Sequence, residues 1–325
     1  MKRRGLIAVL GGGVAAYGVP RGAARGQTVQ VRRVGILAPG PLGPIEQLKR
    51  RLRDLGWIDG KSIRFEERWG GDDDLSYQKL AAELAALPVD VIVTWSTPAV
   101  LAAKRATTTI PIVMGTIADP LGVGAVSNLA RPGGNVTGFS TQNFELEEKR
   151  LELLREIVPG ATRIVAFGNS NNLYVTNAAK RLTALGAASK LEFLAIEADI
   201  TRGLDEAFQR LKAFRPDGVI VISSPALFPH RAKIVELIAA SRLPAIYPFP
   251  EFAEVGGLAC YATNYDDLFR QAADYVDKIL RDAVAGDLPV QQASSFRFIV
   301  NLKAAQAIGL TIPPAVLARA SEIID

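Results

Sequence analysis

The sequence predicts an α/β protein of two Rossmann-like lobes with parallel sheets, joined by a multi-strand hinge. Two stretches of the 325-residue chain, residues 90–115 and 217–248, share one pattern. Each begins with Asp and a β-branched apolar run, which indicates a buried strand. Each continues with a Ser/Thr-Ser/Thr-Pro corner, a helix-like stretch, a Pro and a second apolar strand. Two similar α/β units predict two similar lobes, and this length is sufficient for two cores.

Four elements precede the first unit in alternating order. Residues 31–40 form an apolar run that predicts a strand, and residues 45–55 carry Leu at helical spacing, which predicts an amphipathic helix. Residues 62–69 alternate in polarity and predict a strand, whereas the Ala/Leu-rich residues 75–87 predict a helix that ends before Pro88. This βαβαβ order predicts a parallel sheet with helices on both faces.

The Gly-rich residues 129–140 predict a turn, a short strand and the first crossing between lobes. The following elements are a helix at 145–158, a strand at 163–169, a helix at 174–185, a strand at 191–197, a helix at 204–214 and the second unit. Residues 244–252 are predicted to cross back, and a third crossing is predicted near a strand at 296–301, after an amphipathic helix at 268–280. The lobes would then comprise 31–140 with 250–285, and 141–249 with 286–325.

The first 26 residues are typical of a cleaved export signal. They combine a basic start, a short apolar stretch and small residues. The apolar stretch is too short for a membrane span, so we expect no direct membrane anchor. The Arg3-Arg4 pair leaves the route, Sec or twin-arginine, open. The formal charge of +5 comes from the five Lys and Arg residues of this segment, so the remaining chain is near neutral. That balance argues against nucleic acid as a partner.

The two corners supply the first candidate site residues. In open α/β sheets ligands bind outside the carboxyl ends of the strands, so facing lobes would aim Ser96, Thr97, Ser223 and Ser224 at a shared cleft. Free N–H groups at a helix start, with neighbouring hydroxyls, can hold a carboxylate, although the same residues also serve as simple helix caps. The repetition of the corner favours a small-molecule site.

Three further groups of residues are candidates, each with a structural alternative. Asp119 ends an apolar strand and can bind a ligand ammonium or form a turn with Pro120. Asn169 and Asn171 can donate amide hydrogen bonds to a ligand or build an Asx turn. Tyr247 and Glu251, in an aromatic-rich segment, suit an amino-acid-like or cyclic ligand, or pack between the lobes.

Motifs for catalysis and cofactor binding are missing from the sequence. Neither G-x-G-x-x-G after a strand nor G-x-x-x-x-G-K-[ST] occurs, and no His/Cys/Asp cluster has metal-ligand spacing. The single histidine, His230, leaves no evident general base, and the single cysteine, Cys260, cannot form an internal disulfide. The sequence therefore predicts a binding protein with no catalytic residue, metal or cofactor.

Several motifs together resemble one known family, the ABC transporter substrate-binding proteins of the tryptophan/tyrosine type, which have the type I periplasmic binding protein fold. The similar stretches are LGWIDGKSIRFEERW (55–69), DVIVTWSTPA (90–99), IPIVMGTIADPLGVG (110–124), LARPGGNVTGFS (129–140), KRLELLREIVP (149–159), residues 256–280 and residues 301–325. The resemblance covers nearly all of the chain after the signal. It departs at residues 281–285, where members usually have Lys-Gly-Ala-Lys-Pro-like residues.

The resemblance implies a periplasmic receptor that delivers a small ligand to an inner-membrane permease with its ATPase. Besides the residues above, it implies cleft positions at Ser140 and Thr141 and in the segment from Tyr261 to Asp266. Three alternatives stay open: a periplasmic sensor that docks on a receptor kinase, an exported enzyme, and a DNA-binding regulator of the same fold. The export signal and the lack of an N-terminal helix-turn-helix argue against the regulator.

Overall fold

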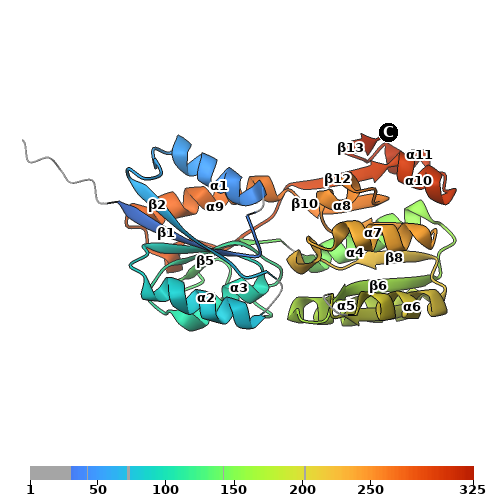
Figure 1. Cartoon of the computed structure of the whole chain (residues 1–325), viewed down its shortest axis with the longest axis horizontal. Coiled ribbons are helices and arrows are strands. Elements are labelled where there is room, and N and C mark those ends of the chain that lie inside the picture. Colours follow the sequence, from blue (N-terminus) through green and yellow to red (C-terminus); the bar gives the residue numbers. More distant parts are fainter. Residues whose placement is uncertain (1–30, 42, 72–73, 142, 201–202) are drawn as a thin grey trace, which may run out of the picture. The chain divides into compact units, whose positions relative to one another are not determined.

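The computed structural model describes residues 31–41, 43–71, 74–141, 143–200 and 203–325. The predicted export signal at residues 1–26 lies outside this part of the chain. Two sheets with helices on their faces make up the described residues (Figure 1). The two α/β lobes that the repeated pattern predicts are therefore present, and the fold class is confirmed.

The first sheet has the strand order β11-β5-β4-β3-β1-β2, and all of its pairs are parallel. Its strands are β1 (Arg32–Ala38), β2 (Ile63–Trp69), β3 (Val91–Trp95), β4 (Ile112–Ile117), β5 (Val136–Ser140) and β11 (Gln291–Gln292). Its helices are α1 (Gly43–Asp54), α2 (Asp74–Ala86), α3 (Thr97–Ala106) and α9 (Tyr265–Leu280). In Figure 1, α1 and α9 lie on one face of this sheet and α2 and α3 on the other. Both faces are covered, so β3 and β4 are buried along their whole length.

The second sheet has the order β13-β12-β10-β9-β8-β6-β7. Its strands are β6 (Arg163–Asn169), β7 (Glu192–Ala198), β8 (Gly218–Val221), β9 (Ala245–Tyr247), β10 (Ala259–Thr263), β12 (Phe296–Asn301) and β13 (Glu322–Ile324). Its helices are α4 (Asn143–Ile157), α5 (Leu173–Ala188), α6 (Leu204–Phe214), α7 (Arg231–Ala240), α8 (Pro250–Glu254), α10 (Leu302–Ile308) and α11 (Pro314–Leu317). The prediction of parallel sheets needs one correction, because β10 and β12 pair antiparallel.

The predicted lobe boundaries at 250 and 286 also need correction. Strand β10 belongs to the second sheet, because it pairs with β9 and β12. Helix α8 packs against β10 and β12, so residues 250–263 lie in the second lobe. Residues 291–292 belong to the first sheet, because β11 pairs with β5. The connections between the sheets therefore follow β5, β10 and β11 in the described chain, and residues 244–252 do not cross back. A strand's partner is set by distant residues, so its local sequence did not reveal its sheet.

The Asp that begins each repeated unit joins two neighbouring strands. The Asp90 carboxylate, just before β3, accepts the Arg33 N–H of β1 at 2.7 Å and pairs with the Arg32 guanidinium at 2.8 Å. Asp217, just before β8, accepts the N–H groups of Thr162 and Arg163 at 2.8 and 2.9 Å. These hydrogen bonds from backbone N–H groups lower the pKa of Asp217. In each sheet, this Asp thus ties the start of one strand to the start of the strand that pairs with it.

Candidate functional site

The ends of strands from both sheets line two adjoining pockets. The aromatic pocket is lined by Trp95, Ser96, Thr97, Thr116, Ile117, Ala118, Asn172, Tyr174, Ser223, Phe249 and Tyr265. The amide pocket is lined by Pro39, Gly71, Tyr77, Ser96, Pro98, Asn169, Asn171, Asn172, Ser224 and Ala226. Ser96 and Asn172 border both pockets. The pockets lie where the carboxyl ends of parallel strands were predicted to face a ligand.

The Ser96 corner between β3 and α3 is strained. Ser96 has φ 96° and ψ 153°, a backbone conformation that residues other than glycine rarely adopt. Its N–H donates to the Thr116 carbonyl at 3.3 Å, and its Oγ accepts the Ala99 N–H at 3.5 Å. Ser96 therefore caps α3 as predicted and also borders both pockets. Strain of this kind is concentrated at functional sites, so the corner is a strong candidate for ligand contact.

The second corner differs from the first in its local structure. Ser223 and Ser224 follow β8, but the chain then forms a 3₁₀ turn (η1, Pro225–Leu227), and α7 begins only at Arg231. The expectation of a helix directly after this corner is therefore wrong. Ser223 borders the aromatic pocket and Ser224 the amide pocket. The Ser224 Oγ is buried and has no hydrogen-bond partner among the described residues.

The asparagine loop after β6 forms the turn that the sequence allowed and also borders the pockets. The Asn169 Oδ1 accepts the Asn171 N–H at 3.2 Å, and the Asn172 Oδ1 caps α5 by accepting the Tyr174 N–H at 3.0 Å. Asn169 is buried, and both it and Asn171 line the amide pocket. The loop therefore combines a structural role with a place in the lining of the amide pocket.

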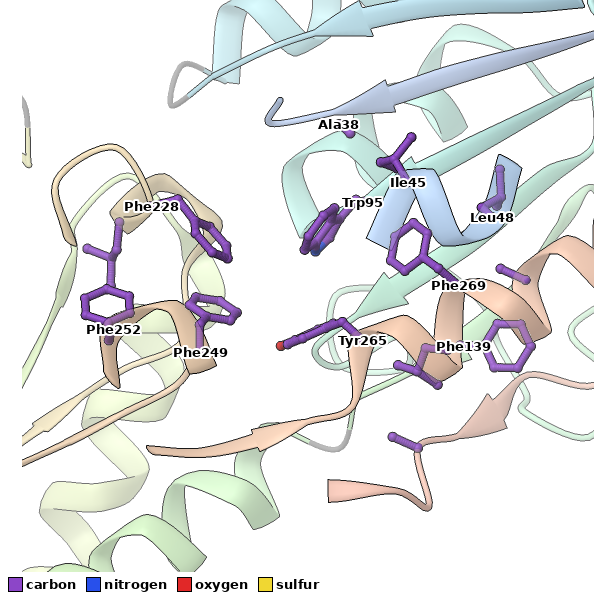
Figure 2. Close-up of a cluster of buried hydrophobic side chains, with 14 of the residues drawn as sticks. Ala38, Ile45, Leu48, Trp95, Phe139, Phe228, Phe249, Phe252, Tyr265 and Phe269 are labelled. Atoms are coloured by element: carbon purple, nitrogen blue, oxygen red, sulfur yellow. The ribbon is translucent and has the colours of Figure 1, made fainter. Parts of the chain in front are cut away.

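Aromatic rings from both lobes meet at the aromatic pocket. The Trp95 ring, at the end of β3, lies 5.8 Å from the Tyr265 ring and 6.3 Å from the Phe228 ring. Phe249 lies 5.6 Å from Tyr265. Figure 2 shows Trp95 between Phe228 and Phe269, with Tyr265 beside it. Such rings provide flat apolar walls suited to a cyclic ligand group.

Six of the predicted site residues line the two pockets. They are Ser96, Thr97, Asn169, Asn171, Ser223 and Ser224. Tyr265, inside the segment 261–266 that the resemblance implied, also lines the aromatic pocket. The sequence interpretation missed Trp95 and Tyr174 as pocket residues. Trp95 was detectable because it directly precedes the first corner, whereas the position of Tyr174 depends on how α5 begins.

The other predicted site residues lie outside the linings of both pockets. The Asp119 carboxylate accepts the Gly122 N–H at 2.9 Å, so it forms the turn that was the alternative interpretation. Thr141 donates from Oγ1 to the Ile117 carbonyl at 3.2 Å, and Ser140 is buried at the end of β5. Direct ligand contact by these three side chains stays a prediction without support from their placement.

The two aromatic candidates of the last third of the chain serve packing in the structure, and the acidic candidate Asp266 does not line either pocket. Tyr247 stacks on Phe252 at 5.1 Å, and Tyr261 stacks on Phe296 at 6.0 Å. Asp266 is exposed in the first turn of α9. Tyr247 borders instead a separate apolar pocket beside α7 and α10. The packing alternative therefore accounts for the two tyrosines.

Glu251 in α8 is a partly buried carboxyl whose Oε2 has no hydrogen-bond partner among the described residues. Burial raises its pKa above the ordinary value of 4.5, and Glu254 acts in the same direction. A raised pKa means that the folded state binds the proton more tightly than the unfolded state. At pH values below the pKa of the unfolded state, Glu251 therefore makes its full contribution to the free energy of unfolding. This contribution falls as the pH rises through the pKa of the folded state.

We expect Glu251→Gln to remove this fall. The melting temperature of the variant minus that of wild type should increase as the pH goes from about 4 to 7, because glutamine carries no proton to lose. Thermal unfolding across that pH range measures the difference. Glu206→Gln is the matched control, because Glu206 is exposed in the first turn of α6, as Glu251 lies in the first turn of α8. Parallel curves for wild type and Glu251→Gln would contradict the prediction.

The pockets carry no formal charge among their described lining residues, but a buried ion pair lies directly behind them. Arg150 Nη1 is 2.8 Å from Glu147 Oε1, and both side chains are at most 2% exposed. Glu147 Oε1 also accepts the Tyr174 hydroxyl and the Ser223 N–H. The signal that could have revealed this pair is helical spacing, since residues 147, 150, 154 and 157 share the buried face of α4. The sequence interpretation missed both residues.

The described residues contain no group of three or more His, Cys, Asp or Glu side chains placed to hold a metal ion. Within the same residues, none of the helices is long and apolar enough to cross a membrane. Cys260 is buried, and burial raises the pKa of its thiol.

Known proteins share both the sequence pattern and the fold. The family described as ABC transporter substrate binding protein matches residues 39–324. A tyrosine-binding protein of Clostridioides difficile is 27% identical over 264 residues, which are 80% of this chain and 75% of that protein.

Two crystal structures are similar over 90% of this chain and all of theirs. A conserved domain protein of Vibrio cholerae is 26% identical, with a TM-score of 0.84. The ABC domain of a Streptococcus pneumoniae protein in complex with L-Trp is 24% identical, with a TM-score of 0.83. These matches agree with the predicted type I periplasmic binding protein fold.

Proposed function

The chain belongs to the family of ABC transporter substrate-binding proteins, and from that premise we propose that it is a periplasmic receptor for an aromatic amino acid or a ligand of the same chemistry. As a member of this family it is a solute-binding component that binds a small ligand. In our proposal the ligand binds across the aromatic and amide pockets, and the loaded receptor delivers it to an inner-membrane permease with its ATPase. The predicted export signal supports the location.

The aromatic pocket is the observation that carries the ligand class. Trp95, Phe249 and Tyr265 surround one space with flat apolar walls, and hydroxyls from Ser96, Thr97 and Ser223 border the same space. Ring faces with a few polar groups are typical of sites for cyclic small molecules. The relatives agree with this class, because one is named for binding tyrosine and another was crystallised with L-Trp.

The amide pocket suits the polar end of such a ligand. It lies at the N-termini of α3 and α5, where helix N–H groups favour a negative group. The unpartnered Ser224 Oγ and the Asn169 amide add donors. The aromatic and amide pockets adjoin at Ser96 and Asn172, so one ligand can reach both. We place the ring in the first and the carboxylate in the second.

The electrostatics of the lining favour a ligand without net charge. A zwitterionic amino acid meets that condition, whereas a dianion or a polyamine would have no countercharge among the described lining residues. Among the predicted contacts we keep Ser96, Thr97, Asn169, Asn171, Ser223 and Ser224 in the proposal.

A thermal-shift and calorimetric screen of the purified protein tests the proposal. The panel contains L-Trp, L-Tyr, L-Phe, L-Leu, tryptamine and indole-3-propionate. A ligand at about 100 times its dissociation constant adds roughly 2.7 kcal/mol of stability. We expect aromatic L-amino acids to bind more tightly than L-Leu and than tryptamine, which lacks the carboxylate. Failure of every amino acid to bind the folded protein would contradict the proposed ligand class.

Ser224→Ala tests the carboxylate position. The Ser224 hydroxyl has no protein partner among the described residues, so its removal should cost little stability, but affinity for L-Trp should fall about tenfold, or ~1.4 kcal/mol. The exposed Ser189→Ala, at the far end of α5, is the matched control. Unchanged affinity in Ser224→Ala would place the carboxylate elsewhere.

A further inference from the structure

A buried ion pair on α4 holds residues of the aromatic pocket from behind. Glu147 Oε1 accepts the Tyr174 hydroxyl at 3.1 Å and the Ser223 N–H at 3.0 Å, and it lies 2.8 Å from Arg150 Nη1. Tyr174 and Ser223 both line the pocket, whereas Glu147 does not. One carboxylate oxygen thus fixes two pocket elements, the start of α5 and the corner after β8.

The same network reaches a further strand of the second sheet. Arg150 Nε donates to the Tyr261 carbonyl of β10 at 2.8 Å. Tyr265, at the start of α9, the helix that packs on the first sheet, lines the same pocket as Tyr174 and Ser223. The pair is therefore bonded to α5, to the corner after β8 and to β10.

Stability alone does not explain this pair. Arg150 Nη1 and Nη2 and Glu147 Oε2 are buried without a hydrogen-bond partner among the described residues, so Nη1 meets Glu147 Oε1 as an ion pair without hydrogen-bond geometry. An incompletely hydrogen-bonded buried ion pair is often no more stable than apolar residues of the same size. Burial by itself lowers the pKa of Arg150, but the adjacent Glu147 offsets this effect and the pKa is raised. The hydrogen bonds to Tyr174 and Ser223 are what apolar residues could not supply.

We propose that Glu147 is a positioning residue of the ligand site, with Arg150 as its countercharge. Its Oε1 holds the Tyr174 ring and the Ser223–Ser224 corner where a ligand meets them, without touching the ligand itself. The inference rests on the proposed function for the choice of ligand. The hydrogen bonds that carry it are independent of that choice.

Two double variants separate positioning from the effect of charge. Glu147→Leu/Arg150→Met removes the charges and the acceptor oxygen, whereas Glu147→Gln/Arg150→Met removes the charges and keeps an acceptor for Tyr174 and Ser223. Both remove the ion pair together, so neither leaves a buried charge uncompensated. Lys149→Gln/Glu152→Gln, which removes an exposed ion pair of the same helix and the same spacing, is the matched control.

Calorimetry with L-Trp and L-Tyr is combined with amide hydrogen exchange of the segment 219–228, measured without ligand. We expect the Leu/Met variant to lose at least about tenfold in affinity and to lose exchange protection at the corner. The Gln/Met variant should recover most of the affinity and most of the exchange protection. Equal affinity and equal exchange protection in all proteins would overturn the positioning role. Equal losses in both double variants would also overturn it, because the loss of charge would then be the cause.

The exchange measurement keeps the two proposals distinguishable. If wild type binds neither amino acid, the proposed ligand class fails, and the corner's protection still decides whether Glu147 holds it. If wild type binds and the Leu/Met variant binds equally well with an unprotected corner, the positioning proposal fails while the proposed function stands.

Discussion

Arg150→Met, with Glu147 left in place, is expected to lower the free energy of unfolding by about 3–5 kcal/mol. The substitution keeps much of the side-chain volume but leaves the Glu147 carboxylate buried without its countercharge. Arg150 also donates to the Tyr261 carbonyl, so that acceptor would lose its partner as well. Urea unfolding of the variant and wild type, followed by circular dichroism, measures the difference.

The neighbouring residue on the same helix provides the control for this effect. Lys149 pairs with Glu152 at 2.6 Å on the exposed side of α4, and Lys149→Met should change stability by less than about 1 kcal/mol. A loss of that small size in Arg150→Met would mean that solvent reaches Glu147 and that the pair is not a buried ion pair.

Gly138→Ala should cost about 3 kcal/mol or more. Gly138 has φ 129°, which an L side chain rarely adopts, and an added Cβ would lie 2.2 Å from the Met114 carbonyl oxygen and 2.6 Å from the Met114 nitrogen. Both atoms belong to the backbone of the neighbouring strand β4, so they cannot move aside cheaply. Because β5 leads into α4, we also expect weaker ligand binding.

Chemical denaturation of Gly138→Ala measures this loss. Gly160→Ala is the control, since an added Cβ there would meet no atom within 4 Å and the residue has no positive φ. A stability near that of wild type in Gly138→Ala would show that β4 and β5 separate more easily than their pairing indicates.

The sequence predicted most elements and their order because hydrophobic periodicity is a local signal. The strand at 163–169 and the helix at 204–214 have the predicted bounds, and each repeated unit contains the expected strand pair. The Ser96 corner was found for the same reason, since a Ser-Thr-Pro sequence between a buried strand and a helix indicates an N-cap.

The sequence was less informative about parts of the site that depend on distant residues. Tyr247 and Tyr261 looked like ligand walls, but each stacks on a ring from a neighbouring element. Tyr174 was overlooked, although its position at the start of α5 places it in the pocket. An aromatic residue has the same local appearance in both cases, and only its neighbours decide which role it takes.

The sequence by itself determined the α/β class, the two repeated units and the corners at the ends of β3 and β8. These follow from side-chain periodicity, Pro and Gly positions and capping residues, which act over a few residues. Only the tertiary structure decided that β10 joins the second sheet, with α8 packed against it. It also decided that the Glu147–Arg150 pair meets Tyr174 and Ser223 behind the pocket. Strand pairing and buried polar networks connect residues dozens of positions apart, and their energies depend on burial that a local pattern does not contain.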